Sequence, residues 1–72
     1  MKTPAELREV GARLEEAVAR LPGSPDSPEE LYERYEAMAI AILDSEHAEW
    51  PAGLLEEYLK LWLALRRVEL GV

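Results

Sequence analysis

The sequence predicts an all-α fold, arranged as an up-down-up antiparallel bundle of three helices. The most abundant residues are Ala, Leu, Glu and Arg, which form helices readily because they lose little side-chain entropy there. Residues branched at Cβ are scarce, with isoleucine only at positions 40 and 42, so a β-sheet has little support. Turn-forming segments divide the chain into three stretches, and such short connections make successive helices antiparallel neighbours.

The length of 72 residues allows one domain with a thin core. We expect a single domain over 1–72, with helices at about 4–21, 28–49 and 54–70. Each boundary is set by capping residues, prolines and glycines in the sequence.

The first helix is expected to open on a capping box. Thr3 is placed to cap free backbone N–H groups, Pro4 suits the first helical position, and Glu6 lies three residues after the cap. Gly11 costs about 1 kcal/mol relative to alanine in mid-helix, so its expected purpose is the close approach of a neighbouring helix. The core stripe of this helix is expected at Leu7, Val10, Leu14, Val18 and Leu21.

The second helix repeats the same opening after a linker of turn formers over 22–26. Ser27 is the expected cap and Pro28 the first helical residue. Glu29 and Glu30 lie in the first turn, where acids favour the positive end of the helix dipole. The clear stop is Trp-Pro-Ala-Gly at 50–53. The core stripe is expected at Leu31, Tyr35, Met38 and Ile42.

The third helix carries more apolar surface than a thin bundle needs. Gly53 is its expected N-cap, with Glu56 placed to reach back to it, and Gly71 follows its end. We expect a core stripe at Leu54, Tyr58, Leu61, Leu65 and Val68. A second apolar arc beside it consists of Leu55, Leu59, Trp62, Leu63 and Leu70.

The net charge of −7 is concentrated in one segment. Residues 26–49 carry eight acids against one base, Arg34, whereas the acids and bases of the two flanking segments cancel. Such a surface repels a phosphate backbone, so we expect no nucleic-acid partner. Amphipathic membrane helices place bases on the polar face, so we expect no membrane partner either. A protein with a neutral or basic surface is the better match, although the acids alone would also keep a small protein soluble.

The sequence offers no constellation for chemistry. His47 is the only histidine and cysteine is absent, so a metal site lacks its usual ligands, and we interpret His47 as a solvated residue near a helix end. Adjacent glutamates diverge by about 100° on a helix, and the serines have no paired base. We therefore expect no enzyme, no cofactor and no metal. No signal peptide or membrane span is evident, so a natural protein of this sequence is expected in the cytoplasm.

The apolar surplus predicts a patch shared by the second and third helices, which marks an interaction site. Trp62 is the expected central anchor, because aromatic residues dominate interface hot spots, and Trp62→Ala is expected to cost about 2 kcal/mol of binding or more. A generous core is the simplest alternative. A natural regulatory domain, a homodimer and a fold without any partner are the others. The expected contacts are Tyr32, Glu36, Ile40, Leu43, Leu55, Leu59, Trp62, Leu63 and Arg66.

The two helix openings, Thr-Pro-Ala-Glu-Leu at 3–7 and Ser-Pro-Glu-Glu-Leu at 27–31, resemble those of computationally designed helical proteins. The Ala/Glu/Leu/Arg composition over the whole chain is similar too. This resemblance implies a designed three-helix mini-binder, in which the second and third helices present a rigid apolar face to a protein target. It also implies that the binder would inhibit the target by occupying its surface.

Overall fold

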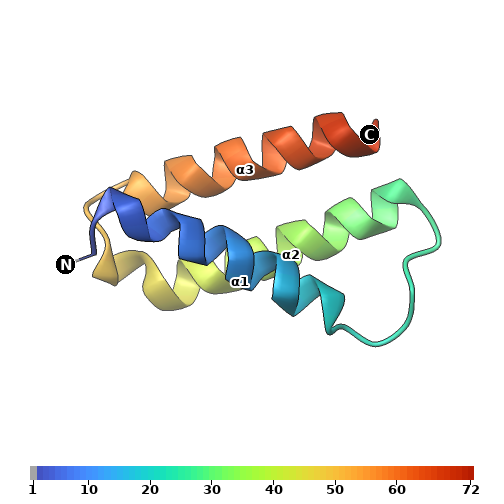
Figure 1. The fold of residues 1–72 in the computed structure, drawn as a ribbon, viewed down its shortest axis with the longest axis horizontal. Helices are drawn as coiled ribbons and strands as arrows, with labels where there is room; N and C mark the ends of the chain where they lie inside the picture. The colour runs from blue at the N-terminus through green and yellow to red at the C-terminus, as the bar shows by residue number, and fades with distance from the viewer. Residues whose placement is uncertain (1) are drawn as a thin grey trace.

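The computed structural model describes residues 2–72, and over these residues it confirms the all-α three-helix bundle. The helices are α1 (Leu7–Ala19), α2 (Pro28–Glu46) and α3 (Leu54–Leu70). Short 3₁₀ turns precede α1 (η1, Pro4–Glu6) and follow α2 (η2, His47–Glu49). Successive helices run in opposite directions, so the start of α1 lies at the same end of the bundle as the α2–α3 connection (Figure 1).

The start of α1 is held by backbone bonds instead of the expected capping box. Thr3 makes no side-chain cap, and the N–H of Glu6 donates to the carbonyl of Thr3 at 3.0 Å, which forms the 3₁₀ turn η1. The capping prediction at Thr3 and Glu6 is therefore wrong. The helix ends at Ala19, before the linker reaches Pro22.

The start of α2 has the cap that the sequence predicts. The hydroxyl of Ser27 accepts a hydrogen bond from the N–H of Glu30 at 3.2 Å, and the Glu30 carboxylate accepts one from the N–H of Asp26 at 2.7 Å. The Ser27 hydroxyl satisfies a backbone donor that a helix start leaves without a partner, and Glu30 reaches back to the residue before the cap. The α-helix ends at Glu46, and η2 carries the helical path on to Glu49.

The start of α3 has no side-chain cap. Gly53 is left-handed, with φ of +79°, and the N–H of Leu54 donates to the carbonyl of Pro51 at 3.0 Å. Glu56 does not reach back to Gly53, and its carboxylate lies 3.6 Å from the ammonium of Lys60 instead. The expected role of Glu56 as a capping partner is therefore wrong.

The core is small and comes mainly from α1. This helix buries four of its five expected core residues, and Leu21 is half-buried. The expected stripe of α2 packs half-buried against the core, and Ala39 is the buried residue of that helix. The complete buried cluster is Leu7, Val10, Leu14, Val18, Ala39, Trp50, Leu55 and Leu59.

Leu54 and Tyr58 of the expected core stripe of α3 are half-buried and pack against the core, but the prediction is wrong for the other three residues. Leu61, Leu65 and Val68 are 63%, 58% and 79% exposed, whereas Leu55 and Leu59 from the other arc are buried. Both arcs are apolar, so hydrophobic pattern alone gives no preference between them. In the structure, Leu55 and Leu59 are the residues of α3 that join the buried cluster.

Gly11 of α1 lies in close contact with α3, as the sequence predicts. A Cβ atom at Gly11 would lie 2.7 Å from the hydroxyl of Tyr58 and 3.0 Å from Nε1 of Trp62. Only a residue without a side chain leaves room for both groups.

Candidate protein-binding surface

Three large apolar side chains are exposed in a row along α3. Leu61, Leu65 and Val68, which we call the outer stripe, are spaced by four and then three residues, so they share one side of the helix. Leu54 and Tyr58 extend the same row toward the start of α3 and are half-buried. The fourth exposed large apolar residue, Ile40, belongs to α2.

The outer stripe points away from both other helices. Arg66 bonds to Glu15 of α1, so the Arg66 side of α3 faces α1. Arg67 lines a shallow pocket with Glu29 and other residues of α2, so its side faces α2. Consecutive residues are rotated by about 100°, which places Leu65 and Val68 on the remaining side. More than half of the surface of each stripe residue is therefore open to solvent.

Trp62, the expected anchor, is engaged inside the molecule. Its ring is half-buried and meets the ring of Tyr35 edge-on, with centroids 5.1 Å apart. The guanidinium carbon of Arg66 lies 4.6 Å from the centroid of Trp62, and Arg66 also pairs with Glu15 and with Glu69, the latter at 2.8 Å. Trp62 and Arg66 thus join α3 to its neighbours, so their partners are already within this chain.

The nine expected contact residues do not form one exposed surface. Leu55 and Leu59 are buried, so no partner reaches them while the bundle stays folded. Glu36 and Ile40 are exposed. The half-buried members are Tyr32, Leu43, Trp62, Leu63 and Arg66.

Some of these nine residues line two shallow pockets. Tyr32 and Glu36 line a pocket of about 280 Å³ with Arg67 of α3. Leu43 and Leu55 line another, of about 450 Å³, at the other end of α2. Residues of the expected patch are therefore divided between the core and two pockets at opposite ends of α2.

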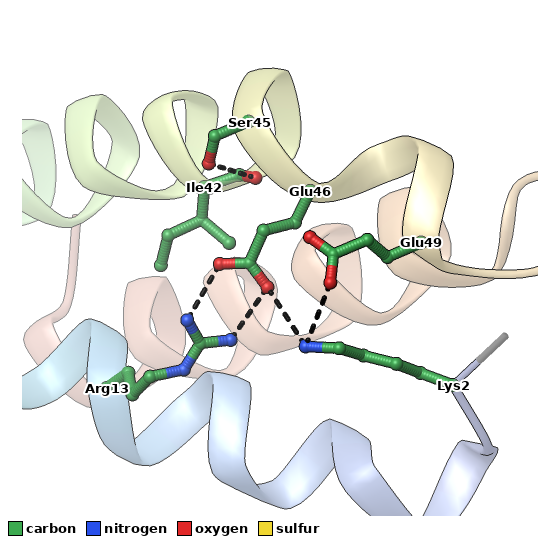
Figure 2. Close-up of polar contacts among 6 residues, drawn as sticks. All are labelled: Lys2, Arg13, Ile42, Ser45, Glu46 and Glu49. Atoms are coloured by element: carbon green, nitrogen blue, oxygen red, sulfur yellow. Dashed lines mark hydrogen bonds and ion pairs between the residues drawn. The ribbon is translucent and has the colours of Figure 1, made fainter.

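A network of ion pairs, at the end of the bundle where α2 finishes, links the N-terminal segment and α1 to the end of α2 (Figure 2). Arg13 donates to both carboxylate oxygens of Glu46, at 2.7 and 2.8 Å. The ammonium of Lys2 lies 3.6 Å from Glu46 and 3.5 Å from Glu49, and the N–H of Lys2 donates to the carbonyl of Glu49 at 2.9 Å. The network positions α1 against α2 and offers no open site.

The same contacts shift two pKa values in opposite directions. The hydrogen bonds from Arg13 lower the pKa of Glu46, and the charges of Arg13 and Lys2 add to this effect, while partial burial opposes it. The pKa of Arg13 is raised by the same hydrogen bonds. Both groups are therefore charged near neutral pH, as a structural ion pair requires.

Trp50 is a core residue that the sequence analysis missed. Trp50 is 3% exposed, its indole N–H has no hydrogen-bond partner within residues 2–72, and the ammonium of Lys2 lies 5.4 Å from its ring centroid. Trp50 lies between α2 and α3 and so belongs to no helical stripe. Periodicity, the main signal used for the other core positions, says nothing about it.

Residues 2–72 contain no group of three metal-ligating side chains placed to hold an ion. His47 hydrogen-bonds locally, with Nδ1 3.0 Å from the carbonyl of Leu43. Within the same residues, none of the helices has both the length and the apolar character needed to cross a membrane. No protein-family model matches this chain, and neither curated proteins nor solved structures give a match.

Proposed function

We propose that this chain is a protein-binding module whose contact surface is the outer stripe of α3. The observation that carries the proposal is the exposure of Leu61, Leu65 and Val68 in one row, on a helix that already buries Leu55 and Leu59 elsewhere. Exposed contiguous apolar side chains of this kind mark interaction sites. The surface lies on one regular helix that is packed on two sides, so it is preorganised and little conformational entropy is lost on binding.

The partner that fits this surface is another α-helix. Leu61, Leu65 and Val68 are separated by steps of four and three residues, which is the spacing of a coiled-coil seam. A facing helix with its own apolar row fits side chains into the gaps between these residues. As a designed binder, the chain would inhibit its target by covering such a helix; the designed origin and the inhibition stay predictions.

The proposal is tested with a phage-displayed library of amphipathic helical peptides. Immobilised wild-type chain is the bait, and the Leu65→Glu variant is the control bait, because a charge in the middle of the stripe opposes apolar contact. Ile40→Glu is the matched second control, since it places the same charge on an equally exposed apolar residue of α2.

We expect the enriched peptides to bind the wild type and Ile40→Glu, and to lose at least about tenfold in affinity for Leu65→Glu. Circular dichroism and urea unfolding of both variants show whether each stays folded. Peptides that bind Leu65→Glu as tightly as the wild type, or a library that yields no stripe-dependent peptide, would contradict the proposal.

A further inference from the structure

We infer that the helix which fits the outer stripe is a basic amphipathic helix of another protein, with lysine or arginine along both edges of its apolar seam. This inference rests on the proposed function and names the chemistry of the partner. The support is the way in which the folded chain distributes the charges of α3 around the outer stripe.

Both edges of the outer stripe are acidic. Glu57 precedes Leu61 by four residues, and Glu69 follows Leu65 by four. Residues four apart on a helix are rotated by only about 40°. Each glutamate therefore lies directly beside the stripe, Glu57 along one edge and Glu69 along the other. Both glutamates are exposed.

The basic side chains of α3 lie on its other sides. The helix carries three acids and three bases, so its composition gives no preference for a charged partner. In the structure, Arg66 pairs with a glutamate of α1, and Arg67 lines the pocket against α2. The ammonium of Lys60 lies 3.6 Å from Glu56, and both side chains are rotated from Leu61 by about 100° or more. The open side of α3 is therefore acidic, although the helix as a whole is neutral.

Glu69 remains accessible although it has a partner within the chain. Nη1 of Arg66 donates to Oε2 of Glu69 at 2.8 Å, and Nη2 of the same guanidinium bonds to Glu15 of α1. The contact with Glu15 holds this guanidinium on the α1 side of the helix. The side chain of Glu69 is still 60% exposed, so its carboxylate is open to a cation from outside the chain.

The two glutamates occupy the positions that set partner choice in coiled coils. In a heptad that follows the spacing of the stripe, Leu65 is at position a, and Leu61 and Val68 are at position d. Glu57 then falls at position g and Glu69 at position e. Charges at e and g pair with opposite charges on the facing helix. Lysine or arginine at e and g of the partner therefore matches both edges of the stripe.

The small apolar area makes this charge match decisive. Three side chains cover less surface than the about 800 Å² that each partner buries in a standard interface. Apolar contact alone therefore gives a weak complex. Complementary charges add affinity and speed association, and the net charge of −7 also attracts a basic partner at long range. We expect an affinity that falls as the salt concentration rises, because both glutamates are exposed.

Three synthetic helical peptides test the chemistry of the partner. All have leucine at a and d over about three heptads, and they differ only at e and g, which are all lysine, all glutamine or all glutamate. Isothermal titration calorimetry measures their affinities for the full chain at about 0.02 M and about 0.5 M NaCl, at concentrations where sedimentation shows each peptide to be monomeric alone.

The lysine peptide is expected to bind at least about tenfold more tightly than the glutamine peptide at low salt, and the glutamate peptide is expected to bind most weakly. Most of the advantage of the lysine peptide should vanish at high salt. A glutamine peptide that binds as tightly as the lysine peptide at low salt overturns the inference.

Paired variants separate contact at the stripe from general attraction to an acidic chain. Glu57→Gln/Glu69→Gln removes both edge charges. The control, Glu9→Gln/Glu56→Gln, removes two exposed charges elsewhere, one on α1 and one on the far side of α3. We expect the edge variant to lose about fivefold in affinity for the lysine peptide and the control to stay within about twofold of the wild type. Circular dichroism shows whether both variants stay folded. Equal losses in the two variants would mean that net charge alone attracts the peptide, and would overturn the inference.

Failure of the basic partner is distinguishable from failure of the proposed function. A glutamine peptide that matches the lysine peptide, and that loses affinity for Leu65→Glu, overturns the chemistry of the partner and leaves the contact surface in place. If none of the three peptides binds in a way that depends on Leu65, both are overturned.

Discussion

Gly11 decides how closely α1 and α3 approach. The free space at its missing Cβ is filled by the Tyr58 hydroxyl and by Nε1 of Trp62. Trp62 is in turn held by Tyr35 and Arg66, so the indole has little freedom to move aside. Because Gly11 has only a hydrogen atom as its side chain, the side chains of Tyr58 and Trp62 can lie directly against α1.

We expect Gly11→Ala to destabilise the bundle by about 1 kcal/mol, because overpacking costs about 1–3 kcal/mol and the gain in helix propensity offsets about 1. Urea unfolding followed by circular dichroism measures the change. The control is Ala12→Gly, which alters propensity alone at the next, exposed position. Tyr58→Phe removes the closest atom, so the loss should shrink in the double variant. A stabilising Gly11→Ala would contradict the close contact.

The carboxylate of Glu46 also interacts with more than one side chain. It accepts two hydrogen bonds from Arg13 and lies 3.6 Å from the ammonium of Lys2. These contacts lower its pKa in the folded state. Its contribution to stability is therefore fully present above the ordinary glutamate pKa of about 4.3 and is lost as pH falls through the lower folded value.

We expect Glu46→Gln to lower the free energy of unfolding by about 1 kcal/mol near neutral pH, since the amide keeps the shape but not the charge. The difference from the wild type should shrink as pH falls through the lowered pKa of Glu46, because the wild-type carboxyl then becomes protonated. Urea unfolding of both proteins across this range provides the comparison. A difference that does not change with pH would show that the charge of Glu46 is unimportant.

At the scale of the helices, two similar sequence openings have different structures. Ser27 caps α2 through its hydroxyl, whereas Thr3 makes no side-chain cap and α1 starts with a 3₁₀ turn. The sequence analysis treats both openings alike, because the same residue types occur at the same spacing. The difference depends on backbone geometry that the pattern does not specify.

The two caps give a paired prediction. Ser27→Ala should lower the free energy of unfolding by about 1 kcal/mol, because it leaves the N–H of Glu30 without its acceptor. Thr3→Ala should change it by less than about 0.3 kcal/mol, since no cap bond is lost. Thermal or urea unfolding of the two variants side by side checks this. Equal losses at both positions would contradict the assignment of the caps.

At the scale of the whole molecule, the sequence predicts the three-helix fold but not which apolar side of α3 is exposed. The stripe of α1 is unambiguous because its other face is charged, so Leu7, Val10 and Leu14 are buried as predicted. On α3 both arcs are apolar. The sequence analysis predicts that the row with Leu61 and Leu65 is the core stripe because its spacing is the more regular.

That assignment is wrong because tertiary contacts outweigh periodicity on α3. Gly11 admits Tyr58 and Trp62, and Arg66 reaches Glu15. These are interactions between positions far apart in the chain, which a helical projection of one segment does not contain. With α3 in this orientation, Leu61, Leu65 and Val68 are left exposed. Gly11 is the one feature of the sequence that predicts the close contact between α1 and α3. A glycine at this position does not indicate which side of α3 makes the contact.

The central claim, that Leu59 faces inward and Leu65 outward, is tested most directly by urea unfolding of two variants of the same chemistry at low protein concentration. We expect Leu59→Glu to lose about 4 kcal/mol or more, because it buries a charge without a partner. Leu65→Glu should stay within about 0.5 kcal/mol of the wild type. A bundle that tolerates Leu59→Glu and unfolds with Leu65→Glu would contradict the account.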